Sequence, residues 1–166
     1  MDDRIILNYF YSDLYSDESD EIQYKTATKA YSRQIIKFMS NESYISAKKV
    51  NPDGIEGVVN LALDQPGFGT FIIATDAYDD IKGVIMCSYE YSDYCDGCYF
   101  WVQFAEAESE DILDGLIQEL KDVTAKDRYW KGLRCVFHKD NSQHWKKIHE
   151  SLRLMPEEIA IYDLLI

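Results

Sequence analysis

Residues 83–120 constrain the fold of this chain more than any other stretch, because they predict two strands, a turn and a helix in direct succession. Gly83 to Tyr91 and Cys98 to Phe104 have the composition of strands, and the Asp96-Gly97 pair before the second is a strong two-residue hairpin signal. The sequence AEAESED then leads into a segment with apolar residues at helical spacing. We therefore expect an antiparallel hairpin, an acidic loop without glycine or basic residues, and a helix.

The remaining sequence predicts further strands and helices on both sides of this hairpin. Ser109 is a suitable N-cap for the helix after the loop, and Glu110 and Asp111 lie in the first turn, where the helix dipole favours anions. Further strands are expected at 22–28, 70–75, 132–138 and 158–166, and further helices at 29–41, from Asp53 with Ile55, Val58, Val59 and Ala62 inward, and at 142–152. Because a strand–helix–strand crossover follows the antiparallel hairpin, the fold class is α+β with a mixed sheet.

One domain, residues 22–166, accounts for this order, and an acidic and aromatic arm, residues 1–21, precedes it. The chain has 30 Asp and Glu residues against 17 Lys and Arg, a net charge of −13. Such a charge disfavours nucleic acid and anionic membrane as partners. It suits a protein partner with a basic surface, a polyamine or solubility alone, and it also fits a surface that mimics the charge of nucleic acid. No apolar run is long enough to span a bilayer, and the N-terminus lacks the features of a leader peptide, so we expect a cytoplasmic or nuclear protein.

Cys95 and Cys98 have the C-x-x-C spacing of many zinc sites. The two residues between them are also the hairpin turn, and a zinc site needs two more ligands, which Cys87, Cys135 or His138 could supply only if the fold brought them close. We therefore expect free cysteines and no metal.

Three segments carry a resemblance to a known family. KTATKAYSRQIIKFM is similar to the first strand and helix of the GCN5-related N-acetyltransferase (GNAT) family, FIIATDAYDDIKGVIMCSYEY to its middle strands, and LRCVFHKDNSQHWKKIHESLRL to its last helical segment. Together with the element order, the resemblance covers about 22–166. It implies the acyl-CoA N-acyltransferase fold and, for an active member, acetyl-CoA as cofactor.

The family's most specific motif, R/Q-x-x-G-x-G/A, is altered here. Alignment of the helices places Glu108 in the Arg/Gln position, Asp111 in the first Gly position and Leu113 in the second. The substitutions add side chains and negative charge where a pyrophosphate would bind, and each carboxylate at about 4–8 Å repels a phosphate charge by roughly 2–4 kcal/mol at an effective dielectric near 20. Two such interactions would cancel a micromolar affinity of about 8 kcal/mol. We therefore favour no cofactor.

If the chain is nevertheless an enzyme, the resemblance implies a set of site residues. Acyl-CoA would lie between the two diverging middle strands, against the backbone at Val102 and Phe104. Glu90 would be the general base, with Glu106 as the second possibility, and His149 the general acid, although His149 also fits an ordinary helix-surface position. The substrate would be a basic amine.

A second similarity is to ornithine decarboxylase antizyme, which is related to this fold and acts by binding protein. LNYFYSDLYSDESDE is similar to the acidic entry of antizymes, and CVFHKDNSQHWKKIHESL to a later strand–helix segment. Three functions therefore stay open: a degenerate GNAT-fold protein that binds a protein partner, which we favour, an atypical N-acetyltransferase, and a nucleic-acid mimic with clustered carboxylates.

Overall fold

The computed structural model describes residues 21–40, 52–92, 96–126 and 128–135. The chain divides into two units, Met1–Val136 and Phe137–Ile166, and every described residue belongs to the first. The helix expected at 142–152, the strand expected at 158–166 and nearly all of the arm, residues 1–20, lie outside the described residues.

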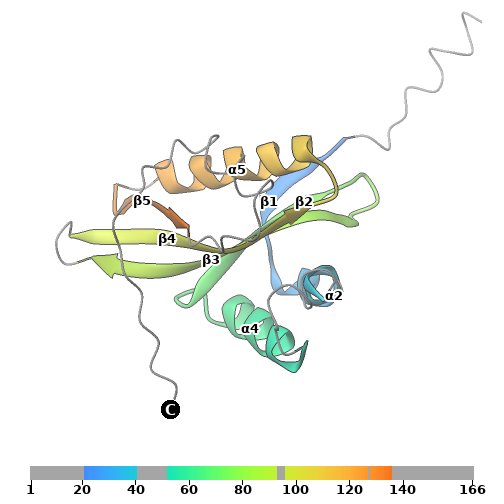
Figure 1. The fold of residues 1–166 in the computed structure, drawn as a ribbon, viewed down its shortest axis with the longest axis horizontal. Helices are drawn as coiled ribbons and strands as arrows, with labels where there is room; N and C mark the ends of the chain where they lie inside the picture. The colour runs from blue at the N-terminus through green and yellow to red at the C-terminus, as the bar shows by residue number, and fades with distance from the viewer. Residues whose placement is uncertain (1–20, 41–51, 93–95, 127, 136–166) are drawn as a thin grey trace, which may run out of the picture. The chain divides into compact units, whose positions relative to one another are not determined.

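Five strands form one mixed sheet in the described part of the chain, with the order β1-β2-β3-β4-β5 (Figure 1). The pairs β1–β2, β2–β3 and β3–β4 are antiparallel, and β5 runs parallel to β4, so the expected mixed sheet is confirmed. The strands are β1 (Gln23–Thr26), β2 (Gly69–Thr75), β3 (Ile81–Ser92), β4 (Gly97–Ala107) and β5 (Trp130–Cys135).

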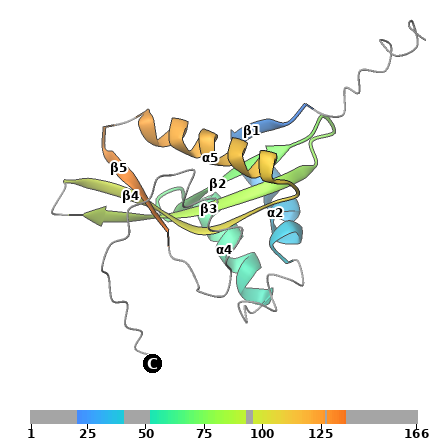
Figure 2. The same cartoon turned by 45° about the horizontal axis from the view of Figure 1, so that its top comes forward.

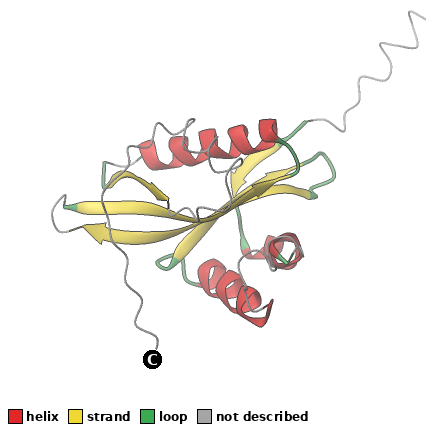
Figure 3. Ribbon diagram, viewed as in Figure 1, coloured by secondary structure: helices red, strands yellow, loops and turns green. Residues whose placement is uncertain are grey.

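Helices cover both faces of this sheet (Figures 2 and 3). The 3-10 helix η2 (Lys29–Tyr31) leads directly into α2 (Ser32–Met39), which packs beside α4 (Pro52–Asp64) on one face. α5 (Glu110–Ala125) lies along the opposite face, against β2, β3 and β4. The layering is therefore helix–sheet–helix, with each helix held by its apolar side.

The apolar residues predicted to face inward are mostly buried. Under α2 and α4 the core cluster includes Ile35, Met39, Ile55, Val59, Phe71 and Phe104. On the other face of the sheet, the buried residues of α5 are Leu113, Leu116, Ile117 and Leu120. The prediction was wrong for Val58, which is 42% exposed. Ile55, Val59 and Ala62 already form a stripe at spacings of four and three residues, and at about 100° per residue Val58 lies at the margin of that stripe.

The connection between β3 and β4 differs from the two-residue turn expected at Asp96-Gly97. Ser92 pairs with Gly97, so Gly97 is the first residue of β4 and the connection consists of residues 93–96. Asp96 adopts the left-handed conformation, with φ of 48°. Cross-strand packing favours this register, since it places the Tyr89 and Phe100 rings edge to face with centroids 5.2 Å apart.

A register shift in the middle of β4 positions the candidate site. Met86 pairs with Phe104 and Cys87 with Val102, so Gln103 is the additional residue of a β-bulge. On the other side of β4, β5 pairs only with the segment from Cys98 to Val102. The segment of β4 from Gln103 to Ala107 lies beyond the pairing with β5; we call it the β4 notch.

Candidate functional site

The β4–α5 loop is closed by its own hydrogen bonds. β4 ends at Ala107, and Ser109 is the N-cap of α5: its Oγ accepts from the Ile112 backbone N–H at 3.3 Å and its carbonyl accepts from Leu113 at 3.1 Å. The helix start expected at Ser109 is therefore confirmed. The cap uses one of the amides at the α5 N-terminus that an anion would otherwise bind.

Lys82 of β3 lies beside this loop, although the loop itself contains no basic residue. The Glu108 backbone N–H donates to the Lys82 carbonyl at 2.8 Å, and the Lys82 ammonium lies 3.7 Å from Glu108 Oε2 and 3.4 Å from Asp76 Oδ2. The hydrogen bond to Asp76, followed by the charge of Glu108, raises the Lys82 pKa. Glu108 is thus partly compensated by a cation, and a second loop amide is already bonded.

The side chain of Asp111 lies in solvent, whereas the side chain of Leu113 lies in the core. Asp111 is exposed. The pKa of Tyr24 on β1 is raised, first because its ring is partly buried and second because of the negative charge of Asp111. Leu113 is 1% exposed and packs into the core. The expectation that Leu113 adds a side chain to the pyrophosphate space is therefore corrected: helical periodicity turns it toward the sheet. Asp111, Glu110 and Glu108 remain as the groups that an anion would meet at this end of α5.

Val102 and Phe104 flank the bulge next to the β4 notch. Their side chains are 3% and 2% exposed, and Phe104 belongs to the core cluster beneath α2 and α4. Only main-chain atoms at these positions can therefore contact a ligand. The main chain of the β4 notch begins directly after Val102, the last residue of β4 that pairs with β5.

Glu90 lies in a three-strand cluster near the hairpin end of the sheet. It is opposite Tyr99 of β4, and its Oε1 accepts a hydrogen bond from Arg134 Nη1 of β5. The guanidinium lies over the Tyr99 ring, 4.1 Å from its centroid, and Arg134 Nε is buried without a hydrogen-bond partner in the described part of the chain. Glu90 is thus a carboxylate held by a cation, with one oxygen already used.

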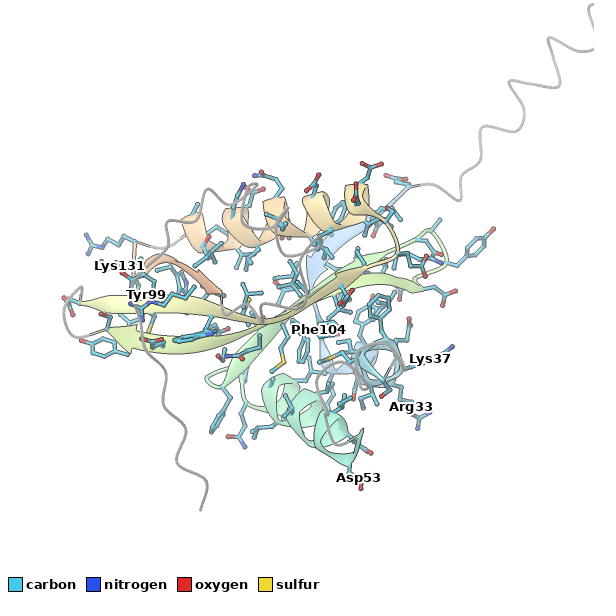
Figure 4. The ribbon with its side chains drawn as sticks, viewed as in Figure 1. Arg33, Lys37, Asp53, Tyr99, Phe104 and Lys131 are labelled. Carbon is cyan, nitrogen blue, oxygen red and sulfur yellow. The ribbon has the colours of Figure 1, made fainter. Side chains whose placement is uncertain are left out.

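The two groups of candidate residues lie in different parts of the sheet. Figure 4 shows Tyr99 near the hairpin end and Phe104 near the middle of β4. Glu106, the second possibility for a base, pairs with Val84 beyond Phe104 and so lies toward the loop. His149 falls outside the described residues, and its role stays a prediction.

Sequence reasoning missed Lys82 and Arg134. Lys82 of β3 contacts Glu108 in the loop after β4, and Arg134 of β5 contacts Glu90 of β3, so no local sequence pattern indicates either contact. A weak signal for Arg134 was available, since a cation in the strand sequence GLRC has to find a partner if that strand is buried.

Within the described ranges, no group of three His, Cys, Asp or Glu residues could hold a metal ion. Cys87 and Cys98 are buried free thiols, and a hydrogen bond with Cys98 raises the Tyr129 pKa. Cys95 and His138 lie outside the described residues. The same ranges contain no helix that is long and apolar enough to cross a bilayer.

No protein-family model matches the sequence, and no curated protein does. Solved structures do match. A possible acetyltransferase from Clostridium difficile 630 superposes with a TM-score of 0.76 at 24% identity, over 87% of this chain and 97% of that one. The chain has the GNAT fold.

Two more acetyltransferases of the GNAT fold match at lower identity. Ribosomal-protein-alanine N-acetyltransferase from Brucella melitensis biovar Abortus 2308 has a TM-score of 0.67 at 12% identity, covering 88% of this chain and 99% of that one. An aminoglycoside acetyltransferase from an uncultured soil metagenomic sample, solved with sisomicin, has a TM-score of 0.69 at 12% identity, covering 87% and 97%. The expected fold is confirmed, and at these identities the likeness establishes the fold alone. The similarity to antizyme stays a prediction.

Proposed function

We propose that this protein has the GNAT fold without a competent acetyl-CoA pyrophosphate loop, and that it acts by binding a protein partner with a basic surface. The observation that carries the proposal is the β4–α5 loop. Two of its amides already donate within the protein, to the Lys82 carbonyl and to Ser109 Oγ. Glu108, Glu110 and Asp111 surround the helix start, where a bound diphosphate needs free amides and no anions.

The charge balance at the loop favours exclusion of a diphosphate. Lys82 forms an ion pair with Glu108, and Asp76 shares this cation. Glu110 and Asp111 add negative charge in the first turn of α5, and a carboxylate at about 4–8 Å repels a phosphate charge by roughly 2–4 kcal/mol before salt screening. That is comparable to the entire binding free energy of a micromolar ligand, about 8 kcal/mol.

The net negative charge of the chain supports a partner with a basic surface. With a charge of −13, the protein attracts a cationic surface from solution and raises the rate of encounter with it. Exposed carboxylates continue along α5 beyond the loop, at Asp114 and Asp122. A basic protein surface is therefore a better match than a nucleic acid or an anionic membrane.

Calorimetric titration with acetyl-CoA and with free CoA tests the cofactor half of this proposal. We expect no saturable heat at ligand concentrations up to about 1 mM, where even a weak complex of about 4 kcal/mol would be half occupied. A dissociation constant in the micromolar range, with the matching rise in thermal stability, would overturn it.

An atypical N-acyltransferase is the second candidate, and the β4 notch favours it. The part of β4 from Gln103 to Ala107 lies beyond its pairing with β5 and could lie along the amide chain of acyl-CoA without the loop, and Glu90 could accept a proton from a basic amine. Its test is turnover of polyamine and peptide amines by the wild type and Glu90→Gln, with Glu56→Gln as an exposed control. Equal rates for all three proteins would remove Glu90 from the mechanism.

A further inference from the structure

Residues 22–40 are cationic in a strongly acidic chain: they contain four Lys and Arg residues and no Asp or Glu. Three of the four, Lys29, Arg33 and Lys37, are spaced four residues apart along η2 and α2, and all are exposed. We call them the α2 stripe. The opposite side of the helix is buried through Ile35 and Met39, so packing leaves the stripe in solvent.

Described carboxylates compensate only the first member of the stripe. Lys29 pairs with Asp64 of α4, with 2.5 Å between Nζ and Oδ1. Arg33 and Lys37 make no hydrogen bond or ion pair with another described residue, and Figure 4 shows both pointing away from the sheet. Like charges four residues apart on a helix destabilise it, so Arg33 and Lys37 favour an anionic partner.

The chain itself contains a segment of complementary charge. Residues 13–21 hold five carboxylates and no cation, at Asp13, Asp17, Glu18, Asp20 and Glu21. This segment ends two residues before β1, whose first residue, Gln23, pairs with Thr75 at the end of β2. The turn that follows Thr75 is the one that holds the start of α2, since Asp79 Oδ1 accepts from Tyr31 at 2.6 Å.

Chain length allows residues 13–21 to reach the whole stripe. Nine residues span at most about 30 Å when extended, whereas the eight residues of α2 are about 12 Å long. We infer that residues 13–21 dock on the α2 stripe, as an intramolecular contact between the acidic arm and Arg33 and Lys37. This contact is independent of the proposed function, and it would compete with any basic partner for the carboxylates of the arm.

Carbodiimide cross-linking of the full chain tests the contact, because the reagent joins a lysine amine to a carboxylate that touches it. Peptide mapping should find Lys37 joined to residues 13–21 at least threefold more often than Lys126, an exposed lysine at the end of α5. The yield should fall at least threefold between about 20 mM and about 500 mM salt, as the screening length shortens from about 20 Å to about 4 Å.

Two variants and an isotope-labelling experiment test whether residues 13–21 contact the α2 stripe within one chain. Arg33→Glu should lower the Lys37 cross-link at least threefold, whereas Arg128→Glu, an equal charge change at another exposed position, should leave it unchanged. Circular dichroism would show that both variants fold. A Lys37 yield no higher than that of Lys126, or unchanged by Arg33→Glu, would overturn the inference. Cross-links that join ¹⁵N-labelled to unlabelled chains in a mixture would overturn it in favour of contact between two copies.

Discussion

Gly115 of α5 is a position where one methyl group should change stability measurably. A Cβ at Gly115 would lie 2.1 Å from Cζ and 2.3 Å from Oη of Tyr24, which comes from β1. Overpacking of this kind costs about 1–3 kcal/mol, while Ala gains about 1 kcal/mol in helix propensity. We therefore expect Gly115→Ala to lower the free energy of unfolding by about 1 kcal/mol in urea denaturation.

Gly57 is a control that separates the cost of overpacking against Tyr24 from the gain in helix propensity. Gly57 of α4 has no heavy atom within 4 Å of the Cβ position, so Gly57→Ala should raise the free energy of unfolding by about 0.5–1 kcal/mol. In a Tyr24→Ala background, Gly115→Ala should behave like Gly57→Ala. Stabilisation by Gly115→Ala in the wild-type background would show that the Tyr24 ring moves aside at little cost.

Ser109 provides a second prediction at the scale of a single residue. Its Oγ accepts from the Ile112 N–H at 3.3 Å, and substitution of a capping Ser by Ala typically costs about 1 kcal/mol. Ser109→Ala should therefore lower the urea midpoint, whereas Ser109→Asp, which keeps an acceptor, should stay within a few tenths of a kcal/mol of the wild type. Equal losses in both variants would indicate that another feature, rather than the cap, fixes the start of α5.

Among the elements, those with a local signal could be predicted from the sequence. The start of α5 followed from a capping residue next to an apolar period, and β2 from the continuous apolar run TFIIAT. The β3–β4 connection was misplaced because register depends on aromatic pairs across the strands, as between Tyr89 and Phe100. The Lys82–Glu108 and Glu90–Arg134 pairs could not be predicted, since only the folded sheet brings these residues together.

The β2–β3 turn contains a carboxyl group, that of Asp76, through which the stability of the fold should depend on pH. Asp76 Oδ1 accepts from the backbone N–H groups of Asp80 at 3.0 Å and Tyr78 at 2.9 Å, and these bonds together with Lys82 hold the Asp76 pKa below its usual value of 3.8. A carboxyl with a lowered folded pKa stabilises the fold above its unfolded pKa, near pH 4, and this stabilisation is lost as the pH falls through the folded pKa.

Asp76→Asn should therefore be less stable than the wild type at about pH 6, and the difference should shrink as the pH is lowered below about 4. Urea midpoints over this pH range measure it. Glu56→Gln, which also removes an exposed carboxylate but one outside this turn, is the matched control for the loss of one negative charge. A constant difference between Asp76→Asn and the wild type would show that the loss reflects turn geometry, not charge.

At the scale of the whole molecule, the GNAT fold and the loop charges make opposite demands on the same place. The fold aims the α5 N-terminus, with its partial positive charge, at a site where the structure carries Glu108, Glu110 and Asp111. If repulsion by these carboxylates is what excludes the cofactor, removing their charge while keeping their shape should restore measurable affinity for CoA. The two bonded amides would limit the gain, because no substitution of side-chain charge frees them.

We expect the triple variant Glu108→Gln, Glu110→Gln, Asp111→Asn to bind CoA with a dissociation constant of about 0.1 mM or less, at least tenfold below the ~1 mM up to which the wild type should show no saturable binding, since a tenfold change needs only about 1.4 kcal/mol of the repulsion to be removed. The matched control neutralises Asp114, Glu119 and Asp122, which lie farther along α5 and give the same change in net charge. Calorimetry at two salt concentrations measures both variants. An equal gain in both variants would assign the effect to net charge, and no gain in either would contradict repulsion by these carboxylates as the basis of the proposed exclusion.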